Sequence, residues 1–300
     1  MIKVIHTADI HFGMENYGKI DQKTGIHSRL LDFKAALDFC VDYAIRENID
    51  LFLFSGDAYK TAHPTPTQQK LFMNCLLRLQ QAGIPMALIV GNHDNALSFG
   101  KAHSLELFND MPLKEFHVIS TPALITFETK NGPVQLVGIP WPTRNTLALH
   151  SSYDTNKAED ITHYIAQAIA SIIQDYATKL DPTIPAILAG HLTVSSGIFS
   201  GSEKRAIYGN DPVLMPSQLA IKPFDYVALG HLHRYQIINP GSYPEIVYSG
   251  SIERIDFGER KEAKGFCLVK LQKPFPCISK TIRPFAWVAV FFMPDKFFSP

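Results

Sequence analysis

The stretch MALIVGNHD at residues 86–94 joins a short apolar run to an amide, an imidazole and a carboxylate. An unbroken aliphatic run of this length, closed by glycine, is typical of a strand that is buried on both faces of a sheet. Similar runs, each bounded by glycine or a polar turn, recur along the chain at 3–9, 50–57, 134–140, 185–191, 225–233, 245–251 and 265–271. The pattern predicts a core made of many short strands.

Helical patterns lie between several of these runs. Three groups of apolar residues repeat with the 3.6-residue period of an α-helix. The groups are Leu30, Phe33, Leu37, Val41 and Ala44; Leu71, Cys75, Leu76 and Leu79; and Ile161, Ile165, Ile169, Ile172 and Tyr176. Because strand and helix alternate, the sequence predicts an α/β fold in which helices flank the sheets.

The composition excludes several classes of protein. Lys plus Arg and Asp plus Glu are 28 each, and a formal net charge of zero argues against a protein that simply coats nucleic acid. No apolar stretch approaches the roughly 20 residues that a membrane-spanning helix needs. Residues 1–12 lack the features of a secretory signal, and the four cysteines form no CxxC pair. We therefore expect a cytoplasmic protein with reduced core thiols.

Potential metal ligands follow five of the predicted strands. Ligands of α/β sheets bind beyond the carboxyl ends of strands, so residues far apart in sequence can meet there. Asp9 and His11 are two positions apart, which in an extended chain puts both side chains on one side. A lone histidine or Gly-Asp at a strand end is more often structural. Together, however, the residues exceed what one ion needs and predict two: Asp9, His11, Asp57, Asn92, His191, His231 and His233.

Glycine precedes most of these residues, and we interpret it as a position where a backbone close to metals and substrate leaves no room for Cβ. The ordered set of DxH (9–11), GD (56–57), GNHD (91–94), GH (190–191) and GHLH (230–233) resembles the calcineurin-like metallophosphoesterase superfamily. Within it, HTADIHFG at the start, FSGDAYK and YSGSIERIDFGE (248–259) resemble the SbcD-type DNA repair nucleases, bacterial relatives of the eukaryotic meiotic-recombination nuclease.

The resemblance, which covers about residues 1–285, implies a fold and a domain division. The expected fold is the calcineurin-like phosphoesterase sandwich, two mixed β-sheets flanked by helices, over residues 1–272. Residues 273–300 would be the start of a truncated capping domain or a C-terminal stub.

The resemblance also implies roles for the site residues. One metal ion would be held by Asp9, His11 and His233 and the other by Asn92, His191 and His231, with Asp57 as the bridging ligand. His93 would be the catalytic histidine beside the metals, and Asp94 would orient it, although Asp94 could instead cap the turn after the strand. Where many relatives carry a second acid after Gly-Asp, this chain has His63, which we interpret as a loop residue.

The implied activity is hydrolysis of phosphodiesters in DNA by two-metal activation of a hydroxide. Such an enzyme would be an exonuclease, with single-strand endonuclease activity as a second option, in double-strand break or DNA-end processing. Imidazole-rich sites fit zinc, iron or nickel, and the resemblance favours two manganese ions. The alternatives are a small-molecule phosphodiesterase or phosphatase that uses the same centre, and a non-catalytic subunit that retains the fold.

The substrate and partners follow from the resemblance and from basic residues near the motifs. Phosphate contacts are expected from Ser202, Lys204, Arg205, Arg254, Arg260, Lys261 and Lys264, although acids in the same loops make a mixed solvated surface an equal alternative. The expected protein partner is an SbcC-type SMC-like ATPase, whose docking segment would be missing from this chain. A homodimer through residues 65–82 is also implied, but intramolecular packing explains their apolar positions equally well.

Overall fold

Two mixed six-stranded sheets form the centre of the molecule, which is described here by a computed structural model covering residues 1–95, 101–109, 111, 113–143, 158–200, 211–273 and 285–292. The first sheet contains β1 (Ile2–Thr7), β2 (Leu51–Phe54), β3 (Met86–Ile89), β4 (Phe116–Ile119), β13 (Gly265–Gln272) and β14 (Phe285–Phe292). Their order is β14-β13-β1-β2-β3-β4, in which β1 to β4 run parallel, β13 is antiparallel to β1, and β14 is antiparallel to β13.

The second sheet has a parallel centre with one antiparallel strand at each edge. It contains β5 (Ala123–Thr129), β6 (Gly132–Ile139), β7 (Ala186–His191), β10 (Tyr226–Gly230), β11 (Gln236–Ile237) and β12 (Glu245–Tyr248). Their order is β11-β12-β10-β7-β6-β5, with β12, β10, β7 and β6 parallel. A separate parallel pair is formed by β8 (Thr193–Val194) and β9 (Val213–Leu214).

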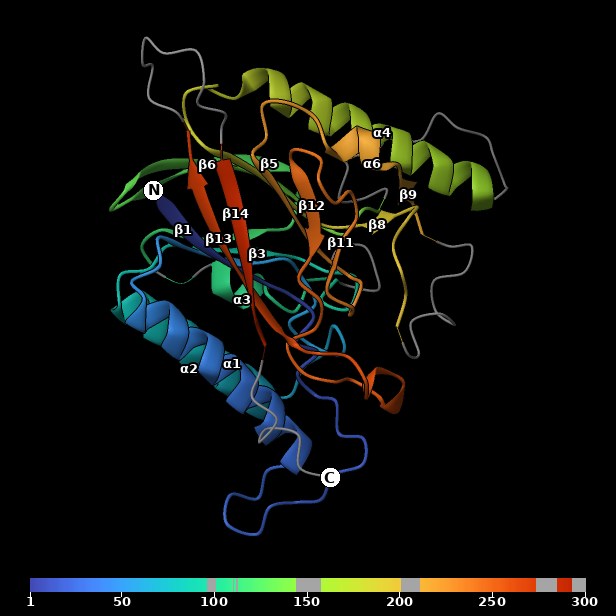
Figure 1. Cartoon of the computed structure of the whole chain (residues 1–300). Helices are drawn as coiled ribbons and strands as arrows, with labels where there is room; N and C mark the ends of the chain where they lie inside the picture. Colours follow the sequence, from blue (N-terminus) through green and yellow to red (C-terminus); the bar gives the residue numbers. More distant parts are fainter. Residues whose placement is uncertain are drawn as a thin grey trace.

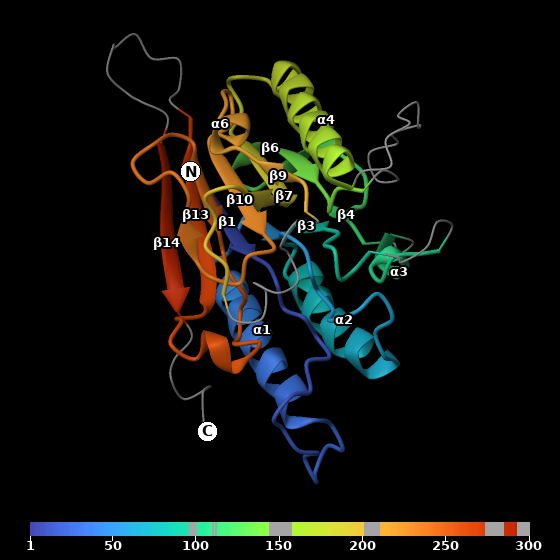
Figure 2. The same cartoon turned by 90° about the vertical axis from the view of Figure 1, so that its right-hand side faces the viewer.

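The helices cover the two outer faces of this sandwich. Their bounds are α1 (Ser28–Arg46), α2 (Pro66–Gln81), α3 (Glu106–Asn109), α4 (Ala158–Lys179), α6 (Pro216–Leu219) and a 3₁₀ turn at Phe257–Glu259. In both views α1 and α2 lie together on one side of the strands and α4 lies on the opposite side (Figure 1 and Figure 2). Helix α2 begins with a capping box between Thr65 and Gln68, with Pro66 in its first turn, which satisfies backbone donors that a helix start leaves free.

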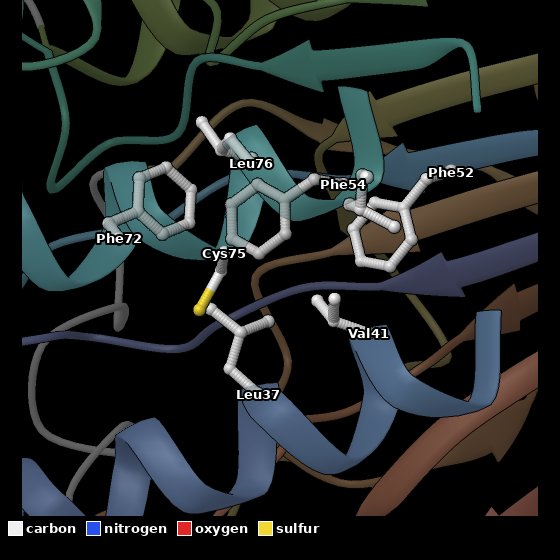
Figure 3. A pocket seen from close by; sticks show the side chains of 8 residues that line it. Leu37, Val41, Phe52, Phe54, Phe72, Cys75 and Leu76 are labelled. Atoms are coloured by element: carbon white, nitrogen blue, oxygen red, sulfur yellow. The ribbon is translucent and has the colours of Figure 1, made fainter. Parts of the chain in front are cut away.

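The core has three layers that follow from this order. Between the sheets, Val4 and Leu53 of the first pack with Leu136 and Ala228 of the second, and all four are fully buried. A second layer lies between the first sheet and α1 and α2, where Leu37 of α1, Phe54 of β2 and Leu76 of α2 line one small apolar space (Figure 3). The third lies between α4 and the second sheet. Dense apolar packing on both faces holds the strand ends in fixed positions.

The strands and helices predicted from the sequence are confirmed, but some strands of the structure were not predicted. Each of the eight apolar runs contains a strand, and the three periodic groups lie in α1, α2 and α4. Strands β4 and β5 were not predicted, because these edge strands are only partly buried and so lack a continuous apolar run. Strand β14 pairs along the full length of β13, from Phe285 opposite Gln272 to Phe292 opposite Gly265. The domain boundary after residue 272 stays a prediction.

The thiol and membrane predictions can be compared with the part of the chain that is described. Cys40, Cys75 and Cys267 are free and buried, as expected, and Cys277 lies outside the described residues. Among the helices described, none combines the length and the apolar character needed to cross a bilayer.

Candidate metal centre

The carboxyl ends of five parallel strands bring the predicted ligands together. Asp9 and His11 follow β1, Asp57 follows β2, and Asn92 to Asp94 follow β3. His191 ends β7, and His231 and His233 follow β10. Because the two sheets pack with these ends at the same edge, residues separated by more than two hundred positions come into contact, as His11 and His233 do.

The backbone beyond β1 differs from the extended chain that was predicted for Asp9 and His11, and the backbone beyond β2 has a similar conformation. Asp9, His11 and Asp57 have φ values of 53°, 51° and 60°, in the left-handed region that costs non-glycine residues about 1–3 kcal/mol each. The two segments are joined by main-chain hydrogen bonds, from Asp9 N to Gly56 O (2.9 Å) and from His11 N to Asp57 O (3.1 Å). The side chains still converge, but through this joined turn structure and not through strand alternation.

Two glycines are required by the close approach of site residues to one another. A Cβ on Gly91 would lie 2.1 Å from Asp57 Oδ1, and one on Gly56, where φ is 100°, would lie 2.2 Å from His191 Nδ1. The prediction that these glycines leave room at the centre is therefore right in kind. The atoms that need the room are the ligand side chains themselves.

One group of donors is formed by Asp9, His11 and His233, whose ligand atoms all lie within 4.8 Å of one another. His233 Nδ1 lies 2.8 Å from Glu259 Oε1, and since a carboxylate only accepts, this nitrogen carries the hydrogen. The lone pair of His233 Nε2 therefore points at His11 Nε2, 3.1 Å away. Burial lowers the pKa of His11 well below its usual value. A neutral imidazole that presents a nitrogen lone pair is what a bound cation needs.

A second group of donors surrounds the side chain of Asn92. Its Oδ1 lies 2.9 Å from His191 Nε2 and 3.2 Å from His231 Nδ1. The outward nitrogens meet acceptors, because His191 Nδ1 is 2.8 Å from Ser55 O and His231 Nε2 is 3.0 Å from Asp211 Oδ2. Each ring is thus held with its other nitrogen toward the centre, the arrangement expected of metal-ligating histidines.

Asp57 lies between the two groups. Its Oδ2 is 3.6 Å from His11 Nε2 and 3.3 Å from His191 Nε2, while its Oδ1 accepts a hydrogen bond from His93 N (2.9 Å). Burial by itself would raise the pKa of Asp57, but His191, His93 and His11 hold it well below the usual range. Burial likewise opposes charging of His191, yet Asp57 raises the pKa of this ring to about 9. An anionic carboxylate between histidines from both sheets fits a bridging role between cations.

His93 and Asp94 are not paired as predicted. His93 is exposed at the edge of the centre, with its ring centroid 4.8 Å from that of His11, and its Nδ1 lies 2.8 Å from Lys60 O. The Asp94 carboxylate instead accepts hydrogen bonds from the backbone N–H groups of Ala58, Tyr59 and Gly91. The orienting contact from Asp94 to His93 is therefore wrong, and the turn-capping alternative describes Asp94. A backbone carbonyl takes the predicted place of the acid.

The sequence did not reveal the residues that contact the histidine rings on the side facing away from the centre. Asp211 and Glu259 contact the histidines of the GHLH motif from behind, and neither stands at a spacing that signals this role. The Trp141 ring covers the histidines of the second sheet, with centroids 4.9 Å from that of His231 and 6.0 Å from that of His191. None of these contacts was detectable without the fold.

The predicted DNA-contacting residues divide into three groups. Lys264 was wrong, because it is buried and pairs with Glu259 at 2.8 Å. Arg254 is half-buried and donates to the Glu262 carbonyl, while Arg260 and Lys261 are exposed. Ser202, Lys204 and Arg205 lie outside the described residues. His63 is exposed on the loop between β2 and α2, in agreement with its interpretation as a loop residue.

Comparison with known proteins decides the family. The model of the calcineurin-like phosphoesterase family matches residues 2–235. The chain belongs to this family. Members named as the SbcD subunit of the nuclease SbcCD, from Escherichia coli strain K12 and from O157:H7, are each 29% identical to it over 272 residues, 89% of this chain. The calcineurin-like chain spans 64% of the length of these two relatives.

Solved structures resemble the chain more distantly. A dimetal phosphatase from Danio rerio is 10% identical, with a TM-score of 0.46 over 89% of this chain and 92% of that one. A purple acid phosphatase from yellow lupin is 13% identical, with a TM-score of 0.48 over 89% of this chain and 49% of that one. The family match, together with the two mixed sheets and their flanking helices, confirms the predicted calcineurin-like sandwich.

Proposed function

We propose that this calcineurin-like phosphoesterase is a manganese-dependent phosphodiesterase that acts on DNA. The observation that carries the proposal is the convergence of buried oxygen and nitrogen donors from five strand ends beside an exposed histidine. The similarity to the SbcD subunit of SbcCD supports DNA as the substrate. The activity would be that of an exonuclease, with single-strand endonuclease activity as a second option, in double-strand break or DNA-end processing.

In this proposal, one set of residues would bind the metal ions and His93 would transfer a proton. Divalent ions held at such a centre would bind phosphate oxygens and lower the pKa of a water molecule. The chain would hold them with Asp9, His11, Asp57, Asn92, His191, His231 and His233. His93 donates its Nδ1 hydrogen to the Lys60 carbonyl, so Nε2 is the ring nitrogen left for proton transfer. A proton carried on this Nε2 can pass to the leaving oxygen of the phosphodiester.

Other parts of the proposal concern the setting of the enzyme. We assign the nuclease domain to residues 1–272 and a capping or C-terminal element to 273–300. The partners would be DNA, with exposed Arg260 and Lys261 among the phosphate contacts, and an SbcC-type ATPase. The free buried thiols support a reducing, cytoplasmic location.

The test separates His93 from the metal ligands. Wild-type protein with Mn²⁺ should cleave bis(p-nitrophenyl) phosphate and degrade linear DNA. His93→Ala should lower both rates by about 10²–10⁴-fold, the contribution typical of a positioned proton donor. The manganese content of this variant, measured by metal analysis after gel filtration, should equal that of the wild type. Full turnover by His93→Ala would refute the assigned role.

The substrate class is tested in the same assay. Linear duplex DNA, single-stranded DNA and a cyclic dinucleotide are compared under Mn²⁺ at equal phosphodiester concentration. We expect hydrolysis of the two DNA substrates to exceed that of the cyclic dinucleotide. The opposite preference would favour the small-molecule phosphodiesterase over the nuclease.

A further inference from the structure

The side of His233 that faces away from the metal centre rests on a buried carboxylate. His233 Nδ1 donates to Glu259 Oε1 at 2.8 Å, and the Glu259 side chain is 1% exposed. The second carboxylate oxygen, Oε2, accepts a hydrogen bond from Ile255 N at 3.0 Å. Both oxygens of Glu259 are therefore engaged, and the carboxylate has a fixed orientation behind the ring.

Lys264 closes this arrangement. Its Nζ lies 2.8 Å from Glu259 Oε2 and donates to the backbone carbonyl of His233 at 2.8 Å. The same ammonium also contacts Glu262 Oε2 at 3.0 Å. One buried cation thus links the carboxylate behind the ring to the main chain of the residue that carries the ring.

Burial makes this set of contacts costly unless every charge is matched. The Lys264 side chain is 1% exposed, like that of Glu259. Removing Lys264 would leave the Glu259 charge uncompensated in the interior, whereas removing Glu259 would leave Glu262 as the carboxylate beside Lys264. Both side chains are almost fully shielded from solvent, so these charges are not explained by a contribution to the solubility of the protein surface. The feature they share is contact with His233.

We propose that Glu259 is a positioning residue for His233 and that Lys264 holds Glu259 in place. The carboxylate keeps the hydrogen on Nδ1 and the ring in one orientation, so that the Nε2 lone pair is directed at the ion shared with Asp9 and His11. This inference rests on the metal centre of the proposed function. It assigns a role to two residues that no ligand motif contains.

The test compares substitutions with graded effects on the hydrogen bond. Glu259→Ala removes the acceptor, Glu259→Gln keeps one oxygen that can accept from Nδ1, and Glu262→Gln is the matched control, since Glu262 contacts Lys264 but not His233. Manganese binding is measured by calorimetry, and the electron paramagnetic resonance spectrum distinguishes coupled ion pairs from single ions. We expect Glu259→Ala to weaken one of two manganese equivalents by about 10–100-fold and to replace the coupled signal by a single-ion signal.

Glu259→Gln should fall between the wild type and Glu259→Ala, and Glu262→Gln should bind both equivalents within about threefold of the wild type, since effects beyond direct neighbours are small. Wild-type affinity for both ions in Glu259→Ala, or an equal loss in Glu262→Gln, would overturn the inference. If the wild type itself bound no manganese, the metal centre of the proposed function would be the part at fault.

A measurement on the unaltered protein covers the case in which Glu259→Ala does not fold. In metal-free protein labelled with ¹⁵N-histidine, nitrogen–proton correlation spectra report which ring nitrogen carries the hydrogen, and a His233→Asn sample identifies the signal. We expect the Nδ1-protonated form for His233. The Nε2-protonated form would overturn the inference.

Discussion

The two sheets contribute different chemistry to the metal centre and hold it by different means. The first sheet supplies the oxygen donors and one imidazole, whereas the second supplies imidazoles alone, His191, His231 and His233. On the first side, Asp9 and Asp57 are fixed by left-handed backbone conformations and main-chain hydrogen bonds. On the second side, His231 also has a positive φ (100°), and each ring is in addition fixed by an acceptor behind it.

The residues that position the ligand side chains are close in sequence to the ligands on the first side and distant from them on the second. The backbone turns of the first side lie within the DxH and Gly-Asp motifs, so the residues that bind and the residues that position are the same. The acceptors of the second side come from elsewhere: Ser55 directly follows β2 of the first sheet, Asp211 precedes β9, and Glu259 is in the 3₁₀ turn. On the first side, substituting a positioning residue should therefore remove a metal ligand directly. On the second side, substituting an acceptor should affect metal binding through the orientation of a histidine ring.

The largest effect is expected where the two sides meet. Asp57→Asn keeps the shape of the side chain but removes the charge that lies between His11 and His191. We expect a fall of about 10³-fold or more in hydrolysis of bis(p-nitrophenyl) phosphate, equivalent to several kcal/mol of lost metal-dependent stabilisation. Metal analysis should show fewer than two ions per chain. Asp175→Asn, at an exposed position of α4, is the control; unchanged metal content in Asp57→Asn would argue against a bridging carboxylate.

An intermediate effect is expected from the acceptor behind His231. Asp211→Ala should weaken one manganese equivalent by about 10–100-fold, as measured by calorimetry, because the ring loses the partner that holds Nδ1 toward Asn92. Asp211 accepts from the Thr193 hydroxyl at 3.0 Å, and among the residues that the structure describes no ammonium pairs with it. The thermal midpoint should consequently fall less than in Glu259→Ala. If the thermal midpoint fell as far in Asp211→Ala as in Glu259→Ala, or further, the loss of a partner for a buried ammonium would not explain the cost of removing Glu259.

The smallest effect on the metal centre itself is expected from the contact between the sheets behind it, which acts on stability. His6 of β1 donates from Nε2 to the Leu229 carbonyl of β10 and accepts at Nδ1 from the Tyr226 hydroxyl. Burial lowers the pKa of His6 to about 3, against the opposing effect of the Leu229 carbonyl. Between this value and the ordinary 6.5, the unfolded chain binds the proton that the folded chain refuses. Stability should therefore fall as the pH falls, by about 1.4 kcal/mol per pH unit.

Urea unfolding of metal-free protein between pH 4 and 7 measures this dependence. The contribution of His6 is fully present above pH 6.5 and is lost progressively below it, so His6→Gln should show a shallower decline than the wild type. His163→Gln, at an exposed position of α4, should follow the wild-type curve. Identical slopes for all three proteins would show that this contact does not couple the sheets to pH.

Much of the fold could be predicted because its elements carry local signals. Continuous apolar runs marked the central strands, and helical periodicity marked α1, α2 and α4. Edge strands such as β4 and β5 alternate less clearly, because solvent covers part of their surface and relaxes the requirement for apolar residues. The same reasoning explains Lys264: a lysine in a charged loop is normally solvated, and only the packing around Glu259 makes it a buried ion.

The sequence by itself determined the α/β fold class and the candidate ligands, because strand ends, glycines and donor types are properties of short segments, and the family resemblance of its motifs implied the sandwich. The tertiary structure alone decided which nitrogen of each histidine faces the centre, and that Asp94 caps a turn while the Lys60 carbonyl contacts His93. These choices depend on hydrogen bonds between residues that are distant in the chain. A ring nitrogen takes its role from the partner on its far side, and only folding brings that partner into reach.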